Sequence, residues 1–286
     1  MQTITDFKDI QALENNIIYV DAEKSFLNNS NVRFRGNNNI LFVEDGATLQ
    51  GANINFNGNN CVLYLSKSNR PYTIAIDLWE SNAVYIGSDN YFNGMFHAIA
   101  SESKNIIIGD DSLISFGIWL RTADPHLVYS TESYKRINYS KSVFIGDHTW
   151  LGQAALILKG CKIGSGSIIG GGSVASNKLV PSNTSFAGNP AKMVAKDIFI
   201  DPRSVHKWTD DDTKKNEKLK TDKWIYEKSR NTIDISSLDE KLQKAKTAEK
   251  KLEIIKKELA GNHDKNRFFI PHSDSVKKKS SFFSKF

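Results

Sequence analysis

Cysteine is scarce in this 286-residue chain, which contains only Cys61 and Cys161, and neither lies in a Cys-x-x-Cys pair. This pattern argues against a disulfide framework and against a cysteine zinc site, and it fits a reduced, cytoplasmic setting. No run of about 18 apolar residues is present, so no transmembrane helix is expected. The first residues lack the basic start and apolar core of a secretory signal.

An excess of positive charge is missing from the first two thirds of the chain. From Asp197 onward lie 22 of the 38 Lys and Arg residues and 16 of the 32 Asp and Glu residues, which leaves residues 1–196 neutral. We therefore expect two parts, residues 1–200 and a basic extension, residues 201–286. Such an extension suits an anionic lipid, an anionic polymer or nucleic acid, although a solvated helical surface is the plainer interpretation. Nucleic acid is not the partner that we expect.

The strongest positive signal is a six-residue repeat. Aliphatic residues recur at Ile145, Leu151, Ile157, Ile163 and Ile169, and four of the five are followed by glycine. Four positions after each aliphatic residue stands a small side chain, and these are Thr149, Ala155, Cys161, Ser167 and Ser173. Strands alone would show a period of 2 and helices a period of 3.6.

A triangular solenoid explains the period of six. Each coil has three short faces of about six residues, the aliphatic residue points inward onto its copies in neighbouring coils, and the small residue fits the corner. We attribute the glycines to a tight corner that favours a residue without a Cβ. Each coil buries its core only against its neighbours, so several coils are needed.

Upstream the repeat continues in weaker form. Ile108, Ile114 and Leu120 keep the spacing, Ile86 marks an earlier coil, and residues 31–65 are rich in Asn and Gly with alternating apolar residues. We expect one solenoid over residues 30–190, with irregular early coils that place Asn in the turns. The polar segment between Leu120 and 145 contains a proline and predicts a loop that leaves the solenoid, and such loops are usually functional.

The C-terminal extension predicts one helix over residues 236–260 that ends near Gly261. Leu238, Ala245, Leu252 and Leu259 lie seven apart, which favours an amphipathic helix packed on the solenoid over a coiled coil. The last residues, 276–286, mix lysine with phenylalanine. We expect this tail to attach the protein to the inner face of the membrane or to an anionic polymer, with a disordered tail or a cap on the last coil as alternatives.

Three motifs carry a resemblance to a known family. They are RTADPH at residues 121–126, IGDHTWLG at residues 145–152 and AGNPAK at residues 187–192. Together with the repeat, they resemble the bacterial hexapeptide-repeat acyltransferases, and within these the O-acetyltransferases of sugars and of polysialic acid capsules. The resemblance covers residues 80–196. It implies an all-β, left-handed parallel β-helix that forms a homotrimer and transfers acetyl from acetyl-CoA to a hydroxyl of a sugar or capsular polysaccharide.

The resemblance also implies an active site. His126 matches the family's loop histidine, the catalytic base, and Trp150 matches a tryptophan 24 residues later at the wall of the site. A histidine suits this chemistry, because a sugar hydroxyl needs a base that works near neutral pH. Asp124 either orients His126 or caps the turn before Pro125.

For acetyl-CoA, the resemblance implies a groove between two subunits of the trimer. Trp150 and backbone amides around Gly152, Gln153, Gly171 and Ser176 would hold the pantetheine arm, and Lys178, Lys192 and Lys196 are the candidates for its phosphates. The family commonly has threonine and lysine after its final valine, where this chain has Ala175 followed by SNK.

Three other functions compete with sugar O-acetylation. N-acetylation of an amino sugar or an antibiotic would use the same fold and cosubstrate, whereas a non-catalytic scaffold would not need His126 and Trp150. A metal enzyme needs three closely spaced ligands, and the histidines do not have such spacing, so no metal is expected. We place His148 at a coil corner, facing solvent.

Overall fold

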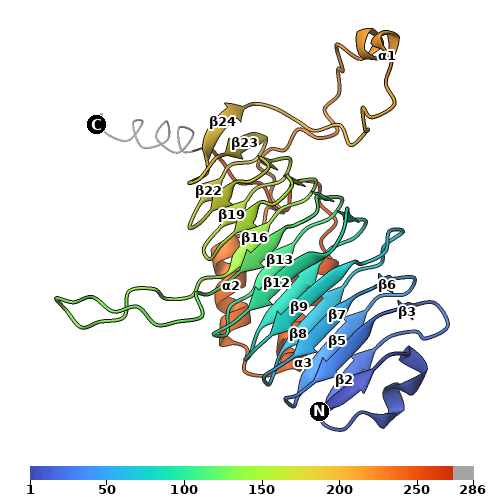
Figure 1. Ribbon diagram of the computed structural model, residues 1–286, viewed down its shortest axis with the longest axis vertical. Coiled ribbons are helices and arrows are strands. Elements are labelled where there is room, and N and C mark those ends of the chain that lie inside the picture. Colours follow the sequence, from blue (N-terminus) through green and yellow to red (C-terminus); the bar gives the residue numbers. More distant parts are fainter. Residues whose placement is uncertain (273–286) are drawn as a thin grey trace.

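The chain forms a parallel β-solenoid with a protruding loop and a C-terminal extension that folds back along it (Figure 1). The computed structural model describes residues 1–272. Successive coils stack strand on strand, so that nearly every strand pairs in parallel with the strand one coil later. The all-β solenoid predicted from the repeat is therefore confirmed.

Three sheets form the sides of the solenoid; the first and second run through all the coils, and the third begins only at β11. The first sheet contains β1 (Gln2–Ile4), β4 (Asn31–Phe34), β7 (Asn53–Phe56), β9 (Ile74–Leu78), β12 (Phe96–Ala100), β15 (Trp119–Arg121), β18 (Leu156–Ile157) and β21 (Val174–Ala175). The second contains β2 (Asn16–Tyr19), β5 (Asn39–Val43), β8 (Val62–Leu65), β10 (Ala83–Ile86), β13 (Ile106–Ile108), β16 (Val143–Ile145), β19 (Lys162–Ile163) and β22 (Leu179–Val180). The third contains β11 (Tyr91–Phe92), β14 (Leu113–Ile114), β17 (Trp150–Leu151), β20 (Ile168–Ile169), β23 (Thr184–Ala187) and β24 (Lys192–Lys196). A separate pair, β3 (Phe26–Asn28) and β6 (Thr48–Gln50), lies in the early coils, which also include a 3-10 helix (Phe7–Ala12).

The core of the solenoid consists of the residues that the repeat selects. The five aliphatic residues from Ile145 to Ile169 are all at most 1% exposed, and the five small residues that follow them are fully buried. In the register, Ile145 pairs with Ile163 in the next coil and Leu151 pairs with Ile169. Like side chains therefore stack along the axis, as the period of six predicts.

The repeat glycines have a reason that the sequence did not reveal. A Cβ on Gly146 would lie 2.5 Å from the backbone nitrogen of Ser165, and one on Gly152 would lie 2.5 Å from that of Gly171. Neither glycine has a positive φ, so the next coil, not the corner conformation, excludes a side chain. The left-handed residues come three positions after each aliphatic residue, as at His148 and Ala154.

The early coils are longer than the later ones, which explains their weaker sequence pattern. Ile86 pairs with Ile108, 22 positions on, whereas Ile145 pairs with Ile163, 18 positions on. Buried asparagines stabilise the longer coils at a corner. The side-chain oxygen of Asn39 accepts a hydrogen bond from the backbone nitrogen of Cys61 at 2.9 Å.

The C-terminal extension contains α1 (Asp210–Lys215), α2 (Ile235–Lys244), α3 (Ala248–Ile255) and a π-helical turn (Lys256–Ala260). The prediction of a single helix over residues 236–260 is wrong, because the chain turns at 245–247. The carbonyl of Ala245 accepts a hydrogen bond from the buried Nζ of Lys251 at 2.7 Å, and Thr247 caps α3. Lys251 also donates to Ser81 Oγ at 2.8 Å, which ties the break to the solenoid.

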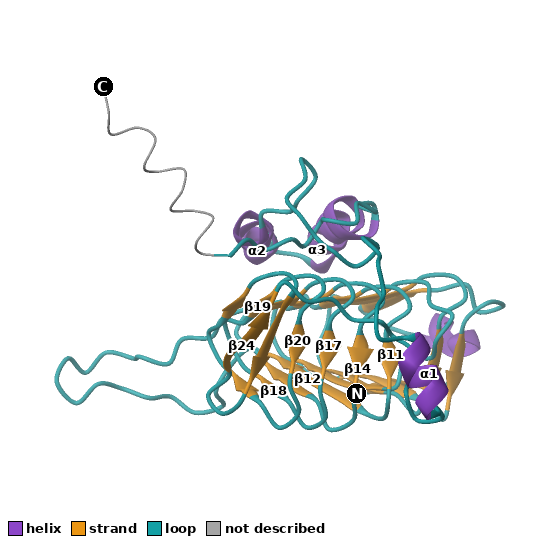
Figure 2. Cartoon of the chain, turned by 90° about the horizontal axis from the view of Figure 1, so that it is seen from above, coloured by secondary structure: helices purple, strands orange, loops and turns teal. Residues whose placement is uncertain are grey.

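The two helices α2 and α3 lie over the second sheet (Figure 2). Leu238, Leu242, Ile255 and Leu259 are fully buried. They form a second core with outward residues of the sheet, among them Ile40, Val62, Tyr64, Ala83, Tyr85, Ile107 and Phe144. The apolar stripe thus packs on its own solenoid, as we favoured, and not in a coiled coil.

One buried arginine fastens the end of the extension to two coils. Arg267 is 2% exposed, and its Nη2 lies 2.8 Å from Asp110 Oδ2 and 2.7 Å from Asp147 Oδ1. Its Nη1 donates to the carbonyls of Leu259 and Asn262. The guanidinium group is therefore paired and hydrogen bonded on several sides, as a buried charge requires.

Two features of the extension bear on the membrane. Within residues 1–272, no helix is long and apolar enough to cross a membrane. The lysine and phenylalanine tail, residues 276–286, lies outside the described residues, so its role in attachment stays a prediction.

We expect Arg267→Ala to lower the free energy of unfolding by about 3–5 kcal/mol, because it leaves the Asp147 carboxylate buried without its partner. Chemical denaturation followed by tryptophan fluorescence measures this change. Lys244→Ala, which removes an exposed ion pair with Glu240, is the matched control and should change stability little. Equal effects of the two variants would contradict a clamping role for Arg267.

Candidate active site

The long loop leaves the solenoid between β15 and β16, at the corner where the first sheet meets the second. Ile108 pairs with Ile145, 37 positions on instead of 18 or 22, so the insertion does not disturb the register. Figure 1 shows it as a long arm, coloured green, that extends away from the body. The predicted loop is confirmed.

An ion pair ties the far arm of the loop to the solenoid. Arg136 donates to both carboxylate oxygens of Glu102, at 2.6 Å from Nη1 and 2.9 Å from Nη2, and Ser140 donates to the same carboxylate. The bonds from Arg136 and then from Ser140 lower the pKa of Glu102 to about 2. This two-point contact has the geometry in which arginine binds a carboxylate most strongly.

Asn138 joins the two arms at the base of the loop. Its Nδ2 donates to the carbonyl of His126 at 2.7 Å and to Asp124 Oδ2 at 3.1 Å, and its Oδ1 accepts from the backbone nitrogen of Val128 at 2.9 Å. Asn138 is 9% exposed and thus sits as a small polar core within the loop. Nothing in the sequence distinguishes it from the chain's many other asparagines.

The carboxylate of Asp124 is held by other groups than the imidazole of His126. It is bonded to Lys159 and Asn138, and these bonds, that from Lys159 first, lower the pKa of Asp124. Lys159 Nζ also donates to the carbonyl of Asn138 at 3.1 Å. Asp124 therefore fixes the base of the loop, and its predicted role in orienting His126 stays a prediction.

His126 and Trp150 lie on different sides of the solenoid. His126 is exposed on the loop at the corner of the first and second sheets. Trp150 lies on β17 of the third sheet, 43% exposed, with its indole Nε1 donating to Ser115 Oγ at 3.4 Å. Because the third sheet is the side opposite that corner, one chain does not bring the two residues together.

The residues expected to hold acetyl-CoA also lie at separate places on the solenoid. Gly152, Gln153 and Gly171 lie at the corner between the third and first sheets, where Gly172 donates from its backbone to the carbonyl of Gln153 at 2.7 Å. Ser176 and Lys178 lie at the corner from which the loop leaves. Lys192 and Lys196 are exposed on β24, the last strand of the third sheet.

His148 does not face solvent, so that prediction is wrong. It is 3% exposed, and its ring lies parallel to Trp224, with 5.2 Å between the ring centres. Its Nδ1 lies 3.0 Å from Asp111 Oδ2, and its Nε2 lies 2.9 Å from the carbonyl of Ile200. The extension, which the repeat gave no reason to place here, covers this corner.

A basic pocket of about 370 Å³ adjoins the base of the loop. Lys104, Lys141 and Lys162 line it, together with Asp239 and Gln243 of α2. Sequence reasoning missed these lysines, because they come from three different coils and meet only when the coils stack.

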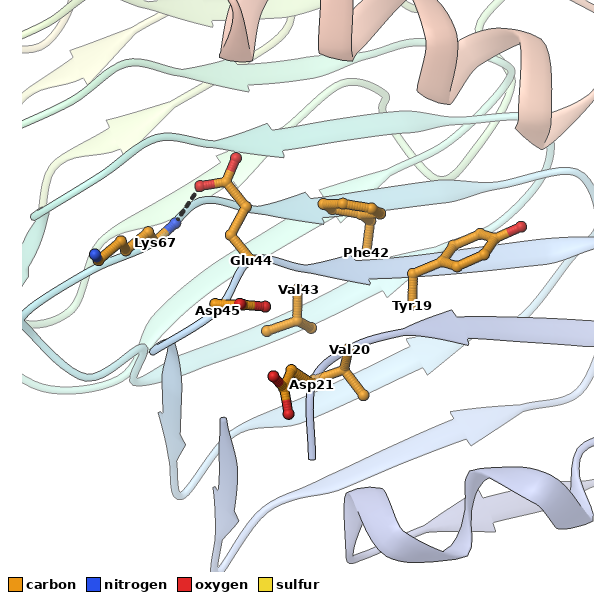
Figure 3. A pocket seen from close by; sticks show the side chains of 8 residues that line it. All are labelled: Tyr19, Val20, Asp21, Phe42, Val43, Glu44, Asp45 and Lys67. Carbon is orange, nitrogen blue, oxygen red and sulfur yellow. Dashed lines mark hydrogen bonds between the residues drawn. The ribbon is translucent and has the colours of Figure 1, made fainter. Parts of the chain in front are cut away.

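A second pocket, of about 380 Å³, lies far from the loop, over the first coils (Figure 3). The rings of Tyr19 and Phe42 stand beside the acidic groups of Asp21, Glu44 and Asp45. Glu44 accepts a hydrogen bond from the backbone nitrogen of Lys67 at 2.7 Å. Three strands of the second sheet, β8, β10 and β13, lie between β5 of this pocket and β16 at the end of the loop, so the pocket takes no part in the candidate site.

In the described part of the chain, no three His, Cys, Asp or Glu residues are grouped as a metal site.

The chain matches the family model described as bacterial transferase hexapeptide (six repeats) over residues 142–177. A polysialic acid O-acetyltransferase of Neisseria meningitidis is 31% identical over 203 residues, which are 71% of this chain and 83% of that protein. The chain belongs to this family of hexapeptide-repeat acetyltransferases.

Other members of the family agree with this assignment. A polysialic acid O-acetyltransferase of Escherichia coli O1:K1 is 34% identical over 42% of this chain and 38% of its own length. The solved structure of the polySia specific acetyltransferase NeuO aligns with a TM-score of 0.61 at 31% identity, covering 70% of this chain and 91% of that one. That of the polysialic acid O-acetyltransferase OatWY aligns with a TM-score of 0.57 at 27% identity, covering 71% and 96%. The left-handed β-helix and an acyltransferase activity, both expected from the motifs, follow from this membership.

In this acyltransferase, the anchor of the loop should depend on pH. The pKa of Glu102 is about 2 in the folded protein against an ordinary 4.5, so the ion pair with Arg136 stabilises the loop above pH 4.5 and is lost as the pH falls toward 2. Glu102→Gln removes the charge at neutral pH. We expect faster amide hydrogen exchange of residues 126–137 in this variant, with residues 145–180 unchanged.

Hydrogen exchange followed by mass spectrometry measures this effect. Asp21→Asn, which removes an exposed ion pair with Lys24 in the first coils, is the matched control. Exchange of the loop that is as slow in Glu102→Gln as in the wild type would show that the ion pair does not anchor the loop.

Proposed function

We propose that this protein transfers an acetyl group from acetyl-CoA to a hydroxyl of a capsular polysaccharide, with His126 as the general base. The observation that carries the proposal is the extent of the likeness to polysialic acid O-acetyltransferases, together with an exposed histidine on the anchored loop. The activity named for these relatives, O-acetylation of polysialic acid, supports an O-linked acetyl and a saccharide acceptor over the N-acetyl alternative.

In the proposed reaction, the acceptor oxygen attacks the thioester carbonyl while the imidazole of His126 takes the hydroxyl proton. A bond forms between the acceptor oxygen and the acetyl carbon, the carbon–sulfur bond breaks, and the imidazolium returns its proton to the CoA thiolate. Backbone N–H groups stabilise the oxyanion that forms between these steps. The protein must hold the histidine at a fixed point, and the bond from Asn138 to the His126 carbonyl serves this purpose.

We further propose that the active enzyme is a homotrimer in which each site uses two subunits. The loop of His126 leaves one corner, and Trp150 lies on the opposite side, so the loop of one copy meets the third sheet of the next. The predicted acetyl-CoA residues are likewise spread from the third sheet to the corner of the loop, which supports a groove between subunits. Closed cyclic assemblies are the usual form of such contacts. A position at the inner face of the membrane stays part of this proposal.

We expect His126→Ala to lower kcat by about 10²–10⁴, as loss of a general base does, while acetyl-CoA still binds. Thiol release with acetyl-CoA and a panel of saccharide, amino sugar and antibiotic acceptors measures kcat, and calorimetry measures binding. The exposed His206, which lies in the extension, provides the matched control His206→Ala. Turnover in His126→Ala close to that of the wild type would refute the assignment.

Mixing a His126 variant with a Trp150 variant tests the shared site. When His126→Ala and Trp150→Ala chains are unfolded and refolded together, some mixed trimers contain an intact His126 loop against an intact Trp150. We expect activity to return in the mixture but not in either variant refolded alone. Light scattering that shows an active monomer, or a mixture that stays inactive although mixed trimers form, would contradict a site that is shared between subunits.

A further inference from the structure

The outward face of the first sheet is polar where the early coils cross it. The register aligns Arg33 of β4 with Asn55 of β7 and with Asp77 of β9. Directly after the ends of these three strands come Arg35, Asn57 and Trp79. We call these six residues the polar face. The helices α2 and α3 cover the second sheet, so the polar face is open in the chain.

Two residues of the polar face, Asn55 and Asp77, are poor choices for a strand. Asparagine and aspartate are depleted in β-strands, because their side chains compete for the backbone and pack weakly on a sheet. Here they hold one another in place: Asn55 and Asn57 donate to Asp77 Oδ1 at 3.0 and 3.2 Å. A network of amide and carboxylate groups on a flat face can exchange hydrogen bonds with the hydroxyls of a sugar chain.

The two arginines keep an uncompensated positive charge. Arg33 Nη1 donates to the amide oxygen of Asn53 at 2.7 Å, and Arg35 Nη1 donates to that of Asn57. Within residues 1–272, neither forms an ion pair with a carboxylate among the salt bridges of the structure. Neutral partners fix each guanidinium group and leave donors free. A guanidinium group with free N–H donors suits a carboxylate, which it binds through two parallel hydrogen bonds.

Trp79 adds an aromatic surface to this face. It is 51% exposed, although its backbone nitrogen is bonded to the carbonyl of Ala100 at 3.1 Å and to Asn82 Oδ1 at 2.9 Å. These two bonds hold the backbone of Trp79 in place while its side chain stays half exposed. Such a ring presents a large, rigid surface with a polar edge, which suits the face of a sugar ring.

The polar face leads to the loop. Ile99 and then Arg121 continue the column of Asp77, and Arg121 is the last residue of β15 before the loop begins. Beside it, His97 stacks on Trp119 with 4.2 Å between ring centres. Strands in a sheet are about 4.8 Å apart, so the four steps from β4 to β15 span about 19 Å, enough for several sugar residues.

We propose that the polar face is the acceptor track, which binds several residues of an anionic glycan and delivers one of them to the loop of His126. This inference rests on the proposed function. The charge of Arg33, Arg35 and Arg121 exceeds that of Asp77, which favours a glycan with carboxylates over a neutral one. The extended chain lies across the strands, so its successive units meet successive coils.

Two sets of variants test the track. Trp79→Ala removes the ring, and Arg33→Ala combined with Arg35→Ala removes the charge. With polysialic acid as the probe, we expect KM to rise about tenfold or more in each, while kcat with free sialic acid and KM for acetyl-CoA stay unchanged. The double variant Lys250→Ala, Lys257→Ala removes two exposed charges from the helical side and should change none of these.

Binding measured apart from turnover completes the test. Calorimetry with polysialic acid should give a weaker Kd for the track variants of the acetyl-CoA-free protein, and neutral dextran should not bind. If the wild type acetylates polysialic acid and the track variants keep its KM and Kd, the track is wrong. If the variants become monomers by light scattering, the face is a contact between copies of the chain, which also overturns the track. A wild type that acetylates no saccharide would refute the proposed function itself.

Discussion

The close stacking of one coil on the next is the constraint on which the rest of this structure depends. Neighbouring strands hydrogen bond at the spacing of a sheet, so like side chains must stack inside, and the backbone of one coil meets the repeat glycines of the coil before it. An insertion can leave the stack only at a corner, where it interrupts no ladder. The loop of His126 does so, and the same rigidity holds its two ends in place for Glu102 and Asn138 to tether.

The stacking of the coils also gives the three sides of the solenoid different surfaces. The second sheet carries outward apolar residues and is covered by α2 and α3, whereas the first carries arginine, asparagine and aspartate and stays open. The third carries Trp150 and ends in the lysines of β24. One short repeat therefore carries three different surfaces: one that packs the extension, one that is polar and open, and one that ends in lysines.

The later coils were predictable because one rule applies at every sixth position, and the motifs around His126 and Trp150 added the family. The longer early coils do not keep that spacing, so the sequence there shows only alternation. Asn138, Lys159 and Glu102 were missed because their roles arise from contacts across coils, which no local pattern records. His148 was misplaced for the same reason, since the segment that covers it comes 50 or more residues later, at Ile200 and Trp224. The helix over residues 236–260 looked continuous because its apolar period runs through Ala245. There the chain breaks, with Lys251 bonded to the Ala245 carbonyl and to Ser81 of the solenoid, which no helical period records.

The course of the extension has a consequence for how the protein is made. In a simple solenoid each coil contacts only its neighbours and can fold as it leaves the ribosome. Here the stacked rings of Phe42 and Tyr64, and Tyr85 beside them, gain their cover only from helices near the end of the chain. Until the helices are synthesised, the aromatic side of the nascent coils stays exposed to water, and such an exposed apolar surface promotes aggregation. Ribosome stalling or premature termination before residue 235 would leave a solenoid with a folded core but an exposed aromatic face on the second sheet. Chaperones would be needed most at this stage.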